Sequence, residues 1–220
     1  FFTTFTNGNT ADGQSGQGCS LGGVVAAANC RGADSAAEFA RQRSKIVENL
    51  VALDADVVGL MEIQNNGGTA VQNLVDALNA RVGAGVYARV ADPAAGTGTD
   101  AIKVALIYRT ARVVPVGASL ADADQVHNRP PLAQAFAARN GERFSVLVNH
   151  FKSKGCDGAT GADLDQLDGQ GCFNGRRIQQ ARALRDFVST VQSTAGTPDV
   201  LLIGDFNAYA QEDPIAELTG

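Results

Sequence analysis

The residues best suited to chemistry follow an apolar run near the end of the chain, in DVLLIGDFNAYAQEDPI. Asp205 and Asn207 come just after Val200 to Ile203, a run typical of a strand buried on both faces. Side chains two positions apart point to the same side of a strand, so this spacing predicts that both project where the sheet opens to solvent. Alternatively, Gly204, Asp205 and Asn207 are turn formers that only end the strand.

Two other apolar runs end in polar residues in the same way. Glu62 follows the run in VVGLMEIQNN, and His150 and Lys152 follow the run in RFSVLVNHFKSKG. Ligand sites commonly lie at strand ends, where rigid backbone meets open loop. Each residue alone has an ordinary structural explanation, but their repeated placement predicts one shared site.

Cleavage of a phosphate ester is the chemistry that this set of side chains suits. A magnesium ion held by Glu62 neutralises and orients the phosphate, and Mg²⁺ needs only one or two carboxylates because it keeps several waters. Asp205 shares the metal or orients the attacking water, and Asn207 fixes the nucleophile or the phosphate by hydrogen bonds. A cationic His150 or Lys152 meets charge on the phosphoryl oxygens.

The elements that must position these residues alternate along the chain. Apolar spacing predicts a helix that begins at Asp34 or Ser35, a second over 70–82 and a third over 173–193. Strands are expected at 57–61, 86–91, 102–108, 112–117, 132–138, 143–149 and 199–204. Consecutive strands indicate antiparallel pairs, so two packed sheets with helices outside, in a single domain over 1–220, fit the count.

Composition sets broad limits on function. The net charge of −5 argues against a protein that coats nucleic acid through bulk charge, although an enzyme with a local basic groove and bound cations remains compatible with it. No apolar stretch approaches 18 residues, so no membrane span is expected. The first residues also lack the features of a signal peptide.

The four cysteines form two local pairs, Cys19 with Cys30 and Cys156 with Cys172. Neither pair has the spacing of a zinc site, so two disulfides that each staple a long loop are favoured over free thiols. Disulfides indicate an oxidising compartment, hence an extracellular location, with the periplasm as second choice. Three aspartates of the second loop, Asp163, Asp165 and Asp168, lack the EF-hand spacing and are interpreted as a solvated loop tip rather than a calcium site.

Together, VVGLMEIQNN, VNHFKSKG and LLIGDFNAY resemble the endonuclease/exonuclease/phosphatase superfamily, and within it the bacterial extracellular nucleases of the pancreatic-deoxyribonuclease-like group. TDAIKVALIYR, HNRPPLAQAF and the cysteine-bracketed loop before NGRRIQQARAL match the same pattern. The resemblance implies an α+β fold, a four-layered α/β/β/α sandwich of two mixed, mostly antiparallel sheets flanked by helices. It also implies hydrolysis of nucleic-acid phosphodiesters with Mg²⁺, or with Mn²⁺ or Ca²⁺ as alternatives.

The resemblance assigns roles residue by residue. Glu62 matches the metal-binding glutamate, and Asp205 and Asn207 match the Asp-x-Asn pair, with Asp205 sharing the metal. His150 matches the histidine that acts on the phosphate or the leaving group. Arg129 in HNRPPL matches the phosphate-contacting arginine, its alternative being a structural residue before a Pro-Pro turn. Lys152 is a second phosphate-binding candidate. Asp100 is a weaker site candidate.

The chain departs from the family pattern at both ends. The pattern continues with a later aspartate and an Asp-His pair, and it places an asparagine just before the position of Phe1. His127 does not match the position of the later histidine. We therefore expect a domain truncated at both ends, with its C-terminal part missing, that has weak activity or none by itself.

Three functions compete on these grounds. The leading hypothesis is a secreted, metal-dependent nuclease acting on DNA, with RNA as a second substrate and no protein partner inferred. A phosphomonoesterase or phospholipid phosphodiesterase of the same superfamily is the second, because loops around the pocket decide the substrate. A catalytically inactive domain that binds phosphate or nucleic acid is the third.

Overall fold

The structure is a computed structural model that describes residues 35–220 without a break. Before residue 35 it describes Phe2, 5–6, 9–10, 19–21, 24–26, 29, 32 and 33. The helices are α1 (Ala36–Leu53), α2 (Thr69–Val82), α3 (Asn174–Ala195), α4 (Asp213–Thr219) and the short 3-10 helix η2 (Gly161–Asp163). The early strands are β1 (Phe5–Thr6), β2 (Asn9–Thr10), β3 (Cys19–Leu21) and β4 (Val24–Ala26). The main strands are β5 (Val57–Gln64), β6 (Tyr87–Arg89), β7 (Ile102–Arg109), β8 (Val113–Ala121), β9 (Leu132–Ala138), β10 (Arg143–His150) and β11 (Val200–Asp205).

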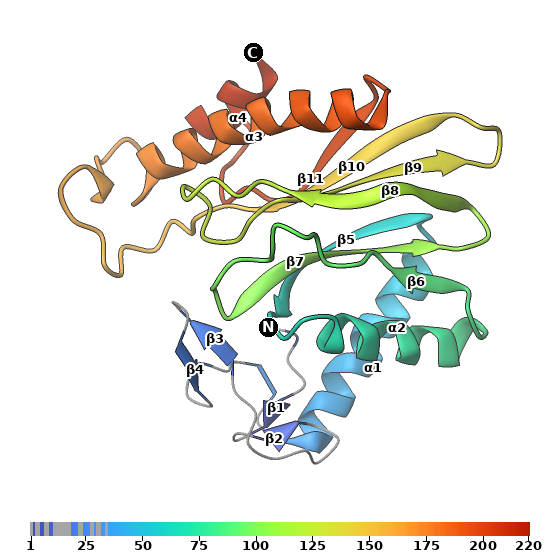
Figure 1. Cartoon of the computed structure of the whole chain (residues 1–220). Coiled ribbons are helices and arrows are strands. Elements are labelled where there is room, and N and C mark those ends of the chain that lie inside the picture. Colours follow the sequence, from blue (N-terminus) through green and yellow to red (C-terminus); the bar gives the residue numbers. More distant parts are fainter. Residues whose placement is uncertain are drawn as a thin grey trace.

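Two sheets form the centre of the molecule (Figure 1). One has the strand order β5-β7-β6 and is antiparallel throughout. The other has the order β11-β10-β9-β8, with antiparallel pairs except for β10 and β11, which run parallel. The parallel pair follows from the connection, because α3 lies between β10 and β11 and carries the chain back to start the next strand at the same end.

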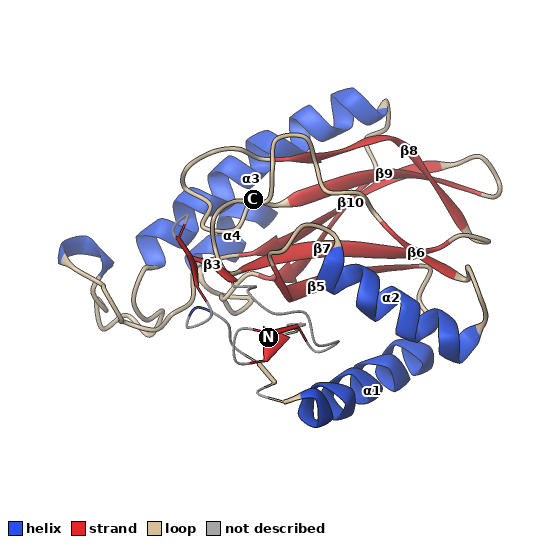
Figure 2. Ribbon diagram, turned by 60° about the horizontal axis from the view of Figure 1, so that its bottom comes forward, coloured by secondary structure: helices blue, strands red, loops and turns tan. Residues whose placement is uncertain are grey.

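Helices cover the outer face of each sheet and give four layers (Figures 1 and 2). Helices α1 and α2 pack on β5 and β7 around Leu74, Leu78 and Ile107. Between the sheets, Leu106, Phe136 and Val148 are fully buried, and α3 packs on the second sheet around Leu147 and Leu184. The α/β/β/α sandwich expected from the sequence is thus confirmed.

Local sequence explains where the helices begin and end. Ser35 is the N-cap of α1, and its hydroxyl accepts a hydrogen bond from the backbone N–H of Glu38 at 3.2 Å. Asp54 ends that helix in the left-handed conformation, and Gly196 ends α3 in the same way. The sequence therefore predicts the three long helices correctly to within a few residues.

One expectation about β11 is wrong. The run Val200 to Ile203 predicts burial on both faces, yet Leu201 is 56% exposed. The cause is position, since β11 stands at the end of the strand order and pairs with β10 alone among the described strands. Leu202 packs in the hydrophobic cluster between α3 and the second sheet, and Ile203 packs in the cluster between the two sheets. The apolar run therefore contributes to two hydrophobic clusters.

The loop before α3 is organised by a disulfide between Cys156 and Cys172, as the sequence predicts, with Cα atoms 5.1 Å apart. Asp165 and Asp168 each accept a hydrogen bond from the backbone N–H two residues further on, at 2.9 Å. These are local Asx-turns. The predicted Cys19–Cys30 disulfide lies outside the described residues. Among the described helices, none has the length and apolar character needed to cross a membrane.

Candidate active site

The parallel pairing of β10 and β11 sets His150 opposite Asp205, at the ends of both strands. The imidazole is buried, with 6% of the residue exposed, whereas the Asp205 side chain is half exposed. Their nearest atoms, Nε2 and Oδ2, are 3.7 Å apart, which is an electrostatic contact but too long for a hydrogen bond. The structure therefore brings two predicted catalytic residues together at one rim of the sheet.

Asn207 joins this pair through a turn and not through strand alternation. The strand ends at Asp205, and the backbone N–H of Asn207 donates to Asp205 Oδ1 at 2.9 Å, with Asn207 at a φ of 47°. The Asn207 amide Nδ2 then donates to the carbonyl of Phe151 at 3.1 Å. Asp205 and Asn207 can therefore both end the strand in a turn and belong to the site. Oδ1 of Asp205 takes part in the turn and Oδ2 does not.

Glu62 occupies a bulge inside β5, not the end of the strand as expected. The register with β7 shifts between Leu60 and Ile63, and Glu62 has a φ of 58°. A β-bulge reorients a side chain, and a left-handed glutamate is an uncommon conformation that the surrounding structure must hold. The backbone of Glu62 is also bonded, because its carbonyl accepts from the N–H of Phe2 at 2.8 Å. The side chain is exposed to solvent.

Arg129 is fixed by three hydrogen bonds beside these residues. Its Nη2 donates to the carbonyl of Phe151 at 2.6 Å, its Nε to the carbonyl of His150 at 3.3 Å, and its Nη1 to Asp100 Oδ2 at 3.3 Å. A guanidinium carries five N–H groups, so two remain for a ligand. The hydrogen bonds confirm a structural role for Arg129, and its contact with a phosphate stays a prediction with which this geometry is compatible.

The electrostatics of the site depend on burial. Burial lowers the pKa of His150, and the positive charge of Arg129 lowers it further, while the carboxylates of Asp205, Glu62 and Asp100 act in the opposite direction and do not cancel the effect. The lowered pKa favours the neutral imidazole over the cation at neutral pH, and the role of His150 as a cation stays a prediction that the pH dependence of the rate can test. The pKa of Arg129 is also lowered, chiefly by burial.

Lys152, the second predicted phosphate-binding residue, follows His150 by two positions and packs its side chain against an aromatic ring. Its ammonium sits 4.2 Å from the centre of the Phe173 ring. Burial is the largest cause that lowers its pKa, followed by the positive charges of Arg129 and Arg176. Its backbone N–H donates to Gln180 Oε1 at 2.9 Å, which ties the end of β10 to α3.

Several residues that support the site were not singled out from the sequence, and they lie on α3. Arg177 is completely buried and donates to the carbonyls of Cys172 and Gln170, both at 2.7 Å. Gln180, also completely buried, bridges Lys152 and the carbonyl of Val126. Their helical spacing of three is visible in NGRRIQQ, but only the fold shows that these polar side chains face inward.

The metal expected at Glu62 and Asp205 matches the chemistry of the donors present. Among the described residues no group of three or more His, Cys, Asp and Glu side chains is poised to hold an ion. Two exposed carboxylates with an amide oxygen nearby form an all-oxygen donor set, which suits a hard cation that keeps part of its water shell. The donor chemistry therefore fits Mg²⁺, Mn²⁺ or Ca²⁺.

A tight contact at Gly204 gives a first testable prediction. A Cβ atom there would lie 2.1 Å from the Asn149 carbonyl oxygen, and the φ of Gly204 is 133°. We expect Gly204→Ala to lower the free energy of unfolding by about 1–3 kcal/mol or more, measured by urea denaturation, because backbone must shift at the end of β11. Gly155→Ala is the matched control, since nothing lies within 4 Å of its Cβ position. Equal stability of the two variants would contradict the close approach.

The disulfide gives a second prediction. Replacing Cys156 and Cys172 together by alanine is expected to lower the free energy of unfolding by about 3 kcal/mol, because the bond joins residues 16 positions apart and closes the loop between them. Denaturation midpoints of the variant and the unaltered chain, both without reductant, measure this effect. Any further change in the variant on adding reductant reports on Cys19 and Cys30. An unchanged midpoint in the variant would show that the bond does not contribute.

Comparison with known proteins places this geometry in context. The sequence profile of the endonuclease/exonuclease/phosphatase family matches residues 26–220. No curated protein sequence matches the chain significantly. An endonuclease/exonuclease/phosphatase family protein from Bacteroides thetaiotaomicron has a similar structure, with a TM-score of 0.58 at 14% identity over 86% of this chain and 64% of that one.

Two further structures share the fold. The mannosyl-6-phosphatase of Bacteroides thetaiotaomicron has a TM-score of 0.57 at 15% identity, over 86% of this chain and 66% of that one. ANGEL2, a 2′,3′-cyclic phosphatase solved with adenosine-2′,3′-vanadate, has a TM-score of 0.51 at 15% identity, over 76% and 44%. The chain thus spans 44–66% of the lengths of these three proteins. With nearly all of its sequence matched by the family profile, the chain belongs to the endonuclease/exonuclease/phosphatase family.

Proposed function

We propose that this chain carries the active site of a divalent-metal-dependent phosphodiesterase that acts on nucleic acid, with DNA as the first substrate to test. One observation carries the proposal, namely the meeting of Asp205, His150 and the tethered Arg129 at one rim of the second sheet. A phosphodiester is anionic and resists attack by hydroxide, so a site for its cleavage needs cations and a proton carrier near the phosphorus.

Each residue of the site has a distinct role in the proposed reaction. Glu62 and Asp205 would hold the metal, with the Asn207 amide oxygen as a further neutral donor, and the metal would neutralise and polarise the phosphoryl oxygens. Arg129 offers its two remaining N–H groups to a phosphate oxygen. A neutral His150 has one N–H and one lone pair, so it can donate a hydrogen bond to the phosphate or accept a proton.

A phosphomonoesterase is the second candidate, and the likeness to the mannosyl-6-phosphatase favours it. The activities of that protein and of ANGEL2, a 2′,3′-cyclic phosphatase, agree on phosphate-ester cleavage and differ in the ester. The same metal-binding and phosphate-binding residues suit hydrolysis of a phosphodiester and of a phosphomonoester, because both substrates present a phosphate and differ only in the groups esterified to it. A binding domain without activity is the third candidate.

We also propose that the protein is exported. The Cys156–Cys172 bond supports an oxidising compartment, since cytosolic thiols are kept reduced. Thiol alkylation of protein taken from culture medium and from cells, followed by mass spectrometry, tests this. Alkylated Cys156 and Cys172 in the native source would contradict it.

Hydrolysis of two activated esters tests the proposed activity. Bis(p-nitrophenyl) phosphate is a diester and p-nitrophenyl phosphate a monoester, and nitrophenol release can be followed at low rates. We expect release from the diester with Mg²⁺ or Mn²⁺, loss of it with EDTA, and nicking of plasmid DNA under the same conditions. Faster cleavage of the monoester would favour the phosphomonoesterase. Absence of both reactions together with retained binding of phosphate esters would favour the inactive domain.

A further inference from the structure

The bulge that carries Glu62 lies at the edge of its sheet. β5 is the last strand in the order β5-β7-β6, and the shifted register leaves Met61 and Glu62 together opposite Val104 of β7. A bulge interrupts the hydrogen-bond ladder with the partner strand. Glu62 also has a φ of 58°, which residues with a side chain seldom adopt. The pairing with β7 therefore gives the backbone of Glu62 less support than a regular strand position receives.

Phe2 supports the bulge from the other edge of β5. Its backbone N–H donates to the carbonyl of Glu62 at 2.8 Å, and its carbonyl accepts from the N–H of Gln64, also at 2.8 Å. These two hydrogen bonds form a parallel bridge between Phe2 and Ile63. Because the bonded carbonyl and N–H flank Ile63, the chain that leaves the bulge is held at the outer edge of the sheet.

The side chain of Phe2 is anchored in the hydrophobic cluster between the first sheet and its two helices. Only 4% of the residue is exposed, and the centre of its ring lies 5.4 Å from that of Phe39. Phe39 belongs to α1 and is buried too, with the guanidinium of Arg43 5.0 Å from the centre of its ring. A continuous line of contacts therefore runs from α1 through Phe39 and Phe2 to the backbone of Glu62.

A cavity of about 230 Å³ lies beside this line of contacts. The residues that line it include Phe2, Gln42, Ile46, Met61 and Glu62. Side chains that border a cavity lack neighbours on that side and forgo the dispersion contacts that a filled core supplies. Packing therefore restrains the bulge less here than inside a filled core, and the two hydrogen bonds of Phe2 supply more of the restraint.

We propose that Phe2 is a positioning residue for the metal site: it fixes the left-handed conformation of Glu62 and so orients the carboxylate for metal binding. The inference rests on the proposed function, because it takes Glu62 as a metal ligand. The side chain of Phe2 is a hydrocarbon and offers no donor to a metal, so its effect on metal binding passes through Glu62. Residues that orient metal ligands typically contribute about 10–100-fold to metal affinity.

Calorimetric titration with Mn²⁺ tests this without turnover. We expect Phe2→Ala to weaken Mn²⁺ binding about 10–100-fold, because alanine keeps the backbone N–H and carbonyl but loses the ring that holds them in place. Phe2→Leu keeps a buried apolar side chain and should recover most of the affinity. Proton exchange at the Gln64 amide, followed by NMR without metal, should be faster in Phe2→Ala, whereas exchange in the second sheet should not change.

A double-mutant cycle separates positioning from a general loss of stability. If Phe2 acts through Glu62, Phe2→Ala should have no further effect on Mn²⁺ affinity once Glu62→Gln has removed the carboxylate. A loss that only reflects a weaker fold would instead be equally large with and without Glu62→Gln. Phe2→Val, a milder truncation, takes the place of Phe2→Ala in the cycle if the alanine variant does not fold.

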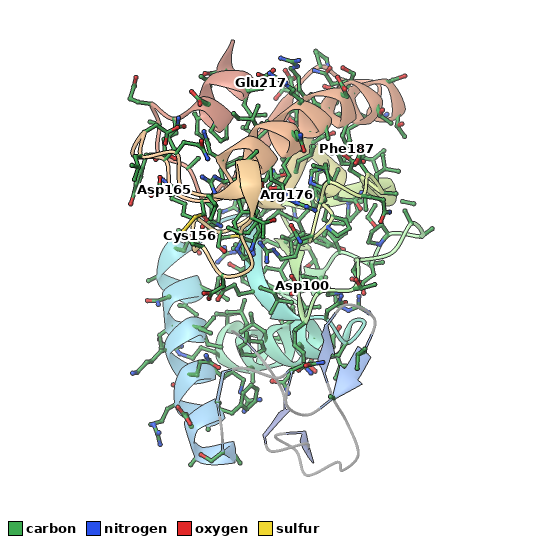
Figure 3. The ribbon with its side chains drawn as sticks, turned by 90° about the vertical axis from the view of Figure 1, so that its left-hand side faces the viewer. Asp100, Cys156, Asp165, Arg176, Phe187 and Glu217 are labelled. Carbon is green, nitrogen blue, oxygen red and sulfur yellow. A yellow bond between two sulfur atoms is a disulfide. The ribbon has the colours of Figure 1, made fainter. Side chains whose placement is uncertain are left out.

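Phe187→Ala is the matched control, because Phe187 is also a buried phenylalanine but belongs to α3, on the opposite side of the molecule from α1 (Figure 3). It should bind Mn²⁺ as the unaltered chain does, and circular dichroism should show the variants folded. Unchanged affinity in Phe2→Ala, an equal loss in Phe187→Ala, or an undiminished effect of Phe2→Ala beside Glu62→Gln would overturn the inference while leaving the metal site intact. Failure of the unaltered chain to bind Mn²⁺ would instead contradict the proposed function, and the inference with it.

Discussion

Replacing His150 by glutamine is expected to lower kcat/KM for a phosphodiester by about 10²–10⁴ relative to the unaltered chain assayed beside it. The imidazole is buried at the end of β10 and faces Asp205, and the backbone carbonyl of His150 accepts a hydrogen bond from Arg129 Nε. Glutamine keeps a donor and an acceptor of similar reach, so binding should persist, but it cannot take up or release a proton near neutral pH. The loss should therefore appear in kcat more than in KM.

The pH dependence distinguishes the neutral from the cationic role of His150. Burial and Arg129 lower its pKa below the ordinary value of about 6.5, and a bound divalent cation would act in the same direction. If the neutral form acts, log kcat/KM is level from about pH 6.5 to 8 and falls below that as His150 takes up a proton. If the cation acts, the rate rises as the pH falls.

Stability must be checked over the same range. Because the folded pKa lies below the unfolded one, the unfolded chain binds the proton first, so folding loses stability as the pH falls from about 6.5 toward the folded pKa. Above that value the contribution is fully present. Fluorescence-detected urea denaturation at each pH separates this loss from a change in rate. A His150→Gln profile that retains the acid limb would assign that limb to another group.

How much of this site could be read from the sequence differs from residue to residue. The ends of the apolar runs correctly located Asp205 and His150, because strand ends and sequence periodicity are local properties. The parallel register that sets these residues side by side depends on the β10–α3–β11 connection, which the helix pattern between the two runs indicates. Recognition of the family order of motifs added Arg129, which periodicity alone could not assign.

The parts that escaped prediction depend on contacts between distant segments. The left-handed Glu62 requires a bulge whose register is set by β7, and the apolar run before it gives no sign of one. The buried Arg177 and Gln180 read as ordinary polar positions of a helix until the loops that they hold are folded against them. The lowered pKa of His150 likewise follows first from burial, which a sequence does not display.

Close packing of the two sheets couples these features. A Cβ atom at Gly59 would lie 2.7 Å from Cδ1 of Ile203. Because glycine has no Cβ, β5 and β11 can pack closely together at this point. This contact links the strand that carries Glu62 to the strand that carries Asp205. The two carboxylates proposed as metal ligands therefore belong to different sheets, and the spacing between them is set by the core.

Replacing Glu62 by glutamine is expected to lower kcat/KM by about 10²–10⁴, comparable to the loss at His150, because removal of a metal ligand forfeits several kcal/mol of charge stabilisation. The expected change in binding is as important as the change in rate. Calorimetric titration with Mn²⁺ should show a weaker site in Glu62→Gln, and excess metal should restore part of the rate.

Glu142→Gln is the matched control for charge, since Glu142 is exposed in the turn before β10, at the opposite end of that strand from His150. Its loss of one negative charge should leave Mn²⁺ affinity and rate within about twofold, because an exposed charge at that distance is screened by salt. If both variants lose metal affinity equally, the effect is one of net charge and Glu62 is no ligand. If Glu62→Gln keeps full affinity and loses the rate, the carboxylate acts on water or phosphate directly. Only a joint loss of affinity and rate, confined to Glu62→Gln and relieved by excess metal, supports the assignment of a metal between the two sheets.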